Sequence, residues 1–148
     1  MGQSSGNATL TTNISDVLQV TVNVTTVSLN FTTPVNYING VSSAVSNQLT
    51  ITCNRAYDLK IKTSGTDMVS GSNTIPVSNI SAQTTGTGLG TQSVVSALST
   101  TDQSLATGIP ASMSKQISMQ FSTAAGNNAF LKPAGAYTTT LTFTAVAN

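Results

Sequence analysis

The stretch NQLTITCNRAYDLKIKT, residues 47–63, decides the fold class, because two alternating segments flank a short polar turn. Its apolar side chains recur at every second position: Leu49, Ile51, Cys53, Tyr57, Leu59 and Ile61. Asp58, Lys60 and Lys62 occupy alternate positions of the second segment. A period of two is typical of a strand with one buried and one solvated face. The stretch therefore predicts two consecutive strands that cover a common core.

The same period recurs along most of the chain and predicts an all-β fold. Further strands are expected near residues 8–14, 17–24, 26–31, 73–80, 115–123 and 137–145. No run of ten or more residues has capped helical spacing. Short strands separated by turn residues predict an antiparallel Ig-like β-sandwich of about seven to ten strands, with a closed barrel as the alternative.

Two connections are interpreted from their turn residues. Asn39-Gly40 is a strong signal for a two-residue hairpin. Residues 81–92, SAQTTGTGLGTQ, are expected to form a loop because of their Gly and Thr content. The length of 148 residues suits one domain. We expect a flexible N-terminus over residues 1–7 and a single sandwich domain over residues 8–148.

Charge is scarce, which argues against several partners. Only 6% of residues are charged and the net charge is +1, whereas about 25% is usual. Nucleic-acid binding needs clustered Lys and Arg, so no nucleic-acid partner is expected. No apolar run approaches the roughly 20 residues that span a bilayer, so no membrane span is expected.

The side chains that usually carry catalysis are also scarce. His and Glu are absent, so a Ser-His-Asp system is impossible and paired carboxylates can come only from four scattered Asp residues. The close pair of Ser112 and Lys115 is the alternative that remains for Ser-Lys chemistry. Cys53 is the only cysteine and alternates with apolar residues, which indicates a buried small side chain. One Cys and no His cannot form a zinc site, and no regular Asp spacing supports calcium. We expect a protein that is not an enzyme, without catalytic residues, metal or cofactor.

The closing residues 133–148, PAGAYTTTLTFTAVAN, resemble the end of bacterial surface and fimbrial sandwiches. The pattern of a Pro/Gly turn, a Tyr and an alternating final strand is similar to spore coat protein U-like and pilin-like domains. It also resembles the distal motif of WxL cell-wall domains, although Phe143 stands where Trp is expected, which weakens any inference of peptidoglycan binding. On this strand we expect Tyr137, Leu141 and Phe143 to face the core, so that Leu141→Asp prevents folding.

The resemblance implies secretion and assembly into filaments or surface layers, in which several pilin-like families donate an N-terminal strand to a neighbour. This chain offers a candidate polymerisation strand in residues 8–14, with Leu10, Thr12 and Ile14 on one face and a break at Ser15-Asp16. An extended segment can add to an exposed sheet edge through main-chain hydrogen bonds. The alternative is that residues 8–14 pair within their own domain.

We therefore expect a secreted structural subunit of a bacterial appendage that self-associates into a homopolymer. An extracellular or cell-surface location is expected, with Met1-Gly2 replacing a removed signal peptide. The alternative function is a monomeric adhesin or carbohydrate-binding module that uses loops near residues 64–74 and 83–92 to hold a surface glycan or protein. The row of Thr138, Thr140, Thr142 and Thr144 is interpreted as a solvated strand face, with ice or polysaccharide binding as the alternative.

Overall fold

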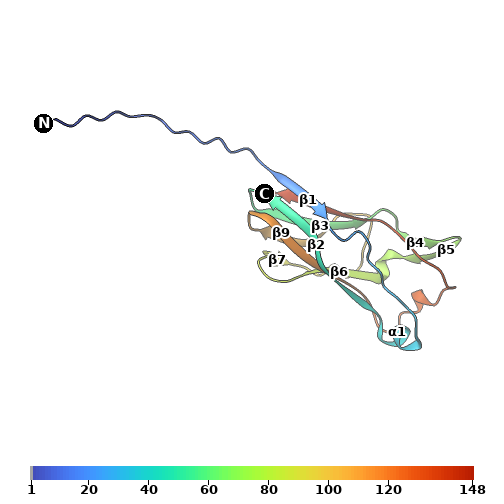
Figure 1. Cartoon of the computed structure of the whole chain (residues 1–148). Helices are drawn as coiled ribbons and strands as arrows, with labels where there is room; N and C mark the ends of the chain where they lie inside the picture. The colour runs from blue at the N-terminus through green and yellow to red at the C-terminus, as the bar shows by residue number, and fades with distance from the viewer. Residues whose placement is uncertain (1) are drawn as a thin grey trace.

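The computed structural model describes residues 2–148, and these form an antiparallel β-sandwich (Figure 1). The first sheet has the order β1-β2-β9-β6, and the second has the order β10-β3-β8-β7. The strands are β1 (Leu18–Val22), β2 (Ser42–Cys53), β3 (Tyr57–Thr63), β4 (Asp67–Ser70), β5 (Asn73–Pro76), β6 (Ile80–Thr85), β7 (Thr91–Gln92), β8 (Gln103–Ile109), β9 (Ser112–Thr123) and β10 (Leu141–Ala147). Strands β4 and β5 form a separate hairpin. The predicted all-β sandwich is confirmed.

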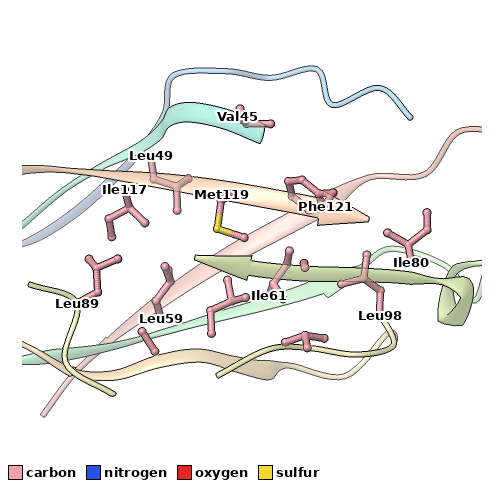
Figure 2. Close-up of a cluster of buried hydrophobic side chains, with 14 of the residues drawn as sticks. Val45, Leu49, Leu59, Ile61, Ile80, Leu89, Leu98, Ile117, Met119 and Phe121 are labelled. Atoms are coloured by element: carbon pink, nitrogen blue, oxygen red, sulfur yellow. The ribbon is translucent and has the colours of Figure 1, made fainter. Parts of the chain in front are cut away.

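The core lies between the two sheets, and the register of the strands explains why (Figure 2). In the first sheet Leu49 lies opposite Ile117, and both are fully buried. In the second sheet Phe143 lies opposite Ile61. Each fully buried aliphatic side chain contributes about 1.5–3 kcal/mol relative to its exposed state. The alternating face of residues 47–63 therefore supplies the centre of the core, as the sequence predicts.

The two ends of the sandwich differ in what they contain. At the end that we call the terminal end, Leu18 lies opposite Cys53, and Asn148 N donates to Ala56 O at 2.8 Å. The opposite end, which we call the α1 end, carries the short helix α1 (Pro34–Asn39) and the 3-10 turn η2 (Asn128–Phe130). In Figure 1 the C-terminus and the start of β1 lie together, and α1 lies at the far end of the body. Consequently β1 runs toward the α1 end, and β10 runs away from it.

A bulge in β2 ends the pairing of β1 part-way along the sheet. Asn47 has a positive φ of 51°, and its N–H donates to Ser118 Oγ at 2.9 Å. The pairing of β1 with β2 ends at Val22, opposite Leu49, and Asn23 N then donates to Gln48 O at 2.7 Å. Beyond Val24 the chain leaves this edge and makes no further strand pairing until after α1. The expected strand at residues 17–24 is thus five residues long.

The predicted Asn39-Gly40 hairpin is wrong, because Asn39 ends α1 and Gly40 begins the lead into β2. Pro34 occupies the first turn of the helix, and Asn36 Oδ1 accepts from Thr33 N at 3.0 Å. Gly40 has φ 77°, and a Cβ there would meet Thr123 O at 2.5 Å. The glycine is needed for this close approach to β9 and for its φ, rather than for a hairpin turn.

The predicted loop over residues 81–92 is only partly correct. Its first half belongs to β6, where Ala82 lies opposite Phe121 of β9. The buried face of β6 is Ile80, Ala82 and Thr84, so the strand has only one large apolar side chain and lacks the apolar alternation that indicates a strand. The following stretch is irregular, yet Val95 and Leu98 are buried. Backbone bonds between Val95 and Ala82, both 2.9 Å, fasten it to β6.

Candidate strand-acceptor groove

The N-terminal segment, residues 2–16, lies outside the sandwich. It forms no strand and extends away from the body in Figure 1. Leu10 is 93% exposed and Ile14 is 80% exposed, and Thr12 between them is also exposed. The strand expected near residues 8–14 is therefore not formed, and the alternative, pairing within the same domain, is not found in the described chain. Their alternation is strand-like, but the described chain gives them no partner strand. Met1 of the expected flexible terminus lies outside the described residues.

The N-terminal segment is held where it meets the sandwich. Val17 N donates to Asn54 Oδ1 at 2.9 Å, and Asn54 Nδ2 donates to Ser15 O at 2.8 Å. Asp16 and Arg55 form an exposed ion pair with an N–O distance of 3.4 Å. These contacts direct the chain outward from the terminal end, so the segment points away from its own body.

A groove of about 740 Å³ opens on the half of the sandwich toward the α1 end. One wall is residues 25–32, which connect β1 to α1, and the other is residues 132–139 together with Leu141. Its floor is apolar and is formed by core residues, namely Met68, Ile75, Val77, Ile80, Leu98, Phe121 and Phe130. Lys132 is the one charged residue among those that line it. At the terminal end β1 and β10 contact each other and limit the groove.

The backbone beside the groove is unpaired. Within the described chain, residues 25–31 make no backbone hydrogen bond. Strand β10 pairs with β3 along one edge, and no strand of the described chain pairs with its other edge. Unpaired N–H and C=O groups on a sheet edge are a template for another extended chain. Such an edge normally carries charge, proline or a covering loop; here the first residue of β10, Leu141, lines the apolar groove.

Each wall carries apolar side chains that are only half-buried. Val27, Leu29 and Phe31 alternate on one wall, each at intermediate burial against the core. Of the residues expected to face the core, Tyr137 and Leu141 line the other wall and Phe143 lies beyond it on β10; all three pack on the core at intermediate burial. They do not form one strand, because β10 begins at Leu141 and Tyr137 precedes it. The Tyr137 hydroxyl donates to Pro133 O at 2.7 Å.

The loops expected to serve a binding module are largely regular structure. Residues 64–74 contain β4 and the first half of β5, and residues 83–85 belong to β6. The Thr row is also not a flat ladder: only Thr142 and Thr144 lie on β10, opposite Lys62 and Lys60. The two sequence features that suggested a ligand, flexible loops and a row of threonines, are therefore not present as such in the structure. The strands take up much of the expected loops, and only part of the threonine row lies on one strand.

Within residues 2–148 no three His, Cys, Asp or Glu side chains gather in a way that could hold a metal ion. Cys53 is a free, buried thiol. Asp58 Oδ1 accepts from Gly108 N at 2.9 Å and from Asn148 Nδ2 at 3.2 Å. No helix of the described part of the chain has the length and apolar character to cross a membrane.

The pKa of one buried hydroxyl, that of Tyr57, is shifted. Burial raises the pKa of the Tyr57 phenol above its ordinary value, and the neighbouring Ser112 side chain acts in the opposite direction. Although Ser112 lies close enough to act on the phenol, the Tyr57 hydroxyl and Ser112 Oγ are both buried and neither makes a hydrogen bond of ordinary geometry. They lie within the sandwich, where Tyr57 is fully buried, so they bear on stability rather than on a surface site.

Comparison with known proteins does not place the chain in a family. No protein-family model matches the chain, and a search of curated proteins gives no significant match. A functional assignment therefore depends on the groove and on the exposed N-terminal segment. Sequence patterns alone indicated the segment. They did not indicate the groove, because the wall at residues 25–31 has the same alternation as a paired strand.

Proposed function

We propose that the chain is a non-enzymatic structural subunit that assembles with copies of itself, each inserting its N-terminal segment into the groove of a neighbour. One observation carries this proposal: the same chain has an alternating apolar segment without a partner and an apolar groove with unpaired walls. Leu10, Thr12 and Ile14 would face the floor, and the odd-numbered residues between them would face solvent. The inserted segment would complete the sheet that ends at β10.

The lengths of the two partners agree. Residues 8–14 and the unpaired wall at residues 25–31 each comprise seven residues, which extend over about 23 Å as strands. Each backbone hydrogen bond gained contributes about 0.5–1.5 kcal/mol. Burying Leu10 and Ile14 contributes about 1.5–3 kcal/mol each. Several such terms together offset the cost of ordering the segment, which is about 1–2 kcal/mol per residue for the backbone.

A neighbour is favoured over the chain's own groove as the acceptor. The segment leaves at the terminal end, whereas the groove opens toward the α1 end. Insertion into its own groove would need a reversal of direction near Ser15–Val17. The hydrogen bonds of Asn54 and the Asp16–Arg55 ion pair hold the outward direction at this position.

Deletion of residues 3–14 tests the proposal. The shortened chain should fold, because the deleted residues contribute nothing to the described core, and it should remain monomeric by light scattering while the full chain forms filaments visible by electron microscopy. A synthetic peptide of residues 3–16 should bind the shortened chain. Filaments from the shortened chain, or a full chain that stays monomeric at high concentration, would refute assembly by this segment.

Two matched double variants distinguish strand insertion from non-specific association of the N-terminal segment. Leu10→Asp with Ile14→Asp places charges against the apolar floor and should abolish assembly. Thr11→Asp with Asn13→Asp adds the same charge to the solvent-facing positions and should leave most assembly intact. Equal effects of the two pairs would show that net charge, rather than insertion, controls association.

A bacterial surface appendage is the setting that we propose for this polymer. The support is the resemblance of residues 133–148 to fimbrial and coat domains, and a surface that relies on Ser and Thr rather than on charge. Antibody labelling of cells that express the chain with a secretion signal should show filaments on the outer surface. Assembly confined to the cytoplasm would contradict this location without affecting strand insertion.

A further inference from the structure

We infer that the outer face of α1, with Val35 and Ile38, is a docking surface for the terminal end of the next copy in the assembly. This inference depends on the proposed strand insertion and specifies its direction. Val35 is 57% exposed and Ile38 is 64% exposed. Residues three apart lie on the same face of a helix. Two large apolar side chains therefore project together at the α1 end of the sandwich.

The direction of the inserted strand follows from its stronger neighbour. The wall at residues 132–139 leads into β10, which begins at Leu141 on the groove and is regular over seven residues, whereas residues 25–31 form no strand. Antiparallel pairing is slightly more stable per residue than parallel pairing. We therefore place the inserted segment antiparallel to β10. Because β10 runs from the α1 end to the terminal end, the inserted segment runs toward the α1 end and brings Ile14 there.

This direction decides the kind of assembly. Three residues after Ile14, the donating copy begins its own sandwich at Val17, so its body must lie next to the α1 end of the acceptor. The contact joins unlike surfaces, the α1 end of one copy and the terminal end of the next, and such heterologous contacts generate open filaments. The parallel direction would place two terminal ends together, which allows two copies to exchange segments and close as a dimer.

The terminal end presents apolar surface that fits this contact. Val17 is 50% exposed and Leu18 is 42% exposed, and both directly follow the donated segment. Insertion up to Ile14 therefore delivers them to the α1 end of the acceptor, where Val35 and Ile38 are exposed. Both apolar patches are small, so we expect them to associate only when the inserted segment already holds the two copies together. Tethering raises the effective concentration of the second contact to the millimolar range.

Substitution of the α1 face tests the docking surface. In the full chain Val35→Ser with Ile38→Ser should raise the concentration needed for filament formation at least tenfold. The same substitutions in the chain lacking residues 3–14 should leave the affinity for the 3–16 peptide within twofold, because the groove is intact. Val94→Ser, at a valine that is 62% exposed elsewhere, is the control and should have no effect. An unchanged critical concentration in the double variant would overturn the inference.

Cross-linking tests the direction independently of affinity. All chains carry Cys53→Ser, which removes the native thiol. One population also carries Ser15→Cys and a size tag. The second population carries either Asn39→Cys, in α1, or Arg55→Cys, at the terminal end. Mixed assemblies should form disulfide-linked pairs of unequal chains with Asn39→Cys. Pairs with Arg55→Cys, or none with Asn39→Cys, would overturn the direction while leaving strand insertion in place. Failure of assembly after deletion of residues 3–14 is a separate result that concerns insertion alone.

Discussion

Phe31 stacks on Phe130 with their ring centroids 4.6 Å apart and their planes inclined by 17°. Phe31 belongs to the wall at residues 25–32, and Phe130 belongs to the turn that leads into the opposite wall. Tyr37 of α1 contacts the same cluster, with its ring centroid 5.0 Å from that of Phe31. The aromatic cluster thus fixes the unpaired wall to the core near its α1 end, where hydrogen bonds do not hold it.

Phe31→Ala should loosen this wall more than it weakens the rest of the sandwich. Full burial of a Phe makes truncation cost 3–5 kcal/mol, and half-burial of Phe31 reduces the expected loss to about 2 kcal/mol. Urea unfolding of the chain lacking residues 3–14 measures this loss. Val146→Ala, on the exposed side of β10, should cost under 1 kcal/mol. Proteolytic cleavage after Leu29 should accelerate in the Phe31 variant alone; unchanged cleavage would show that the stack does not hold the wall.

Leu141→Asp should impair assembly rather than prevent folding, in contrast to the expectation from sequence. Leu141 is half-buried on the groove wall, so a carboxylate there can reach water in the free chain. We expect a stability loss of about 1–2 kcal/mol and at least tenfold weaker binding of the 3–16 peptide. Thr142→Asp, on the exposed face, is the matched control. Calorimetric titration measures both affinities, and equal binding by the two variants would remove Leu141 from the acceptor site.

The core was predictable from sequence because its signal is local and repeated. Leu49, Ile51 and Cys53 alternate without interruption, and a shift by one residue would expose all of them. The structure places all three within the core, each at most 1% exposed. The same argument holds for Ile117, Met119 and Phe121 of β9, which are equally buried.

The groove was not predictable, because pairing is a long-range property. Residues 18–22 and residues 27–31 both alternate, yet only the first set pairs with β2. The difference arises from the bulge at Asn47 and from the course of the chain toward α1, neither of which has a periodic signature. The alternation of residues 8–14 likewise predicts an extended segment and cannot state which strand it pairs with.

Tyr57 gives a prediction for stability against pH. Its phenol is fully buried and its hydroxyl has no hydrogen-bond partner, and burial raises its pKa. The fold therefore favours the neutral phenol. Below the ordinary Tyr pKa of about 10 this contribution is constant, because the phenol is protonated in both states. Above it the unfolded chain ionises first, so stability falls as pH rises toward the folded-state pKa.

Tyr57→Phe removes both the ionisation and the unpaired hydroxyl. At pH 7 the variant should be as stable as the parent, or more stable by up to about 1 kcal/mol, and its advantage should widen above pH 10. Urea unfolding at pH 7 and pH 10.5 measures the difference. Tyr137→Phe, which loses the bond to Pro133 O, should instead cost about 1 kcal/mol at pH 7. A Tyr57→Phe chain that is clearly less stable at pH 7 would show that the hydroxyl is hydrogen-bonded in solution.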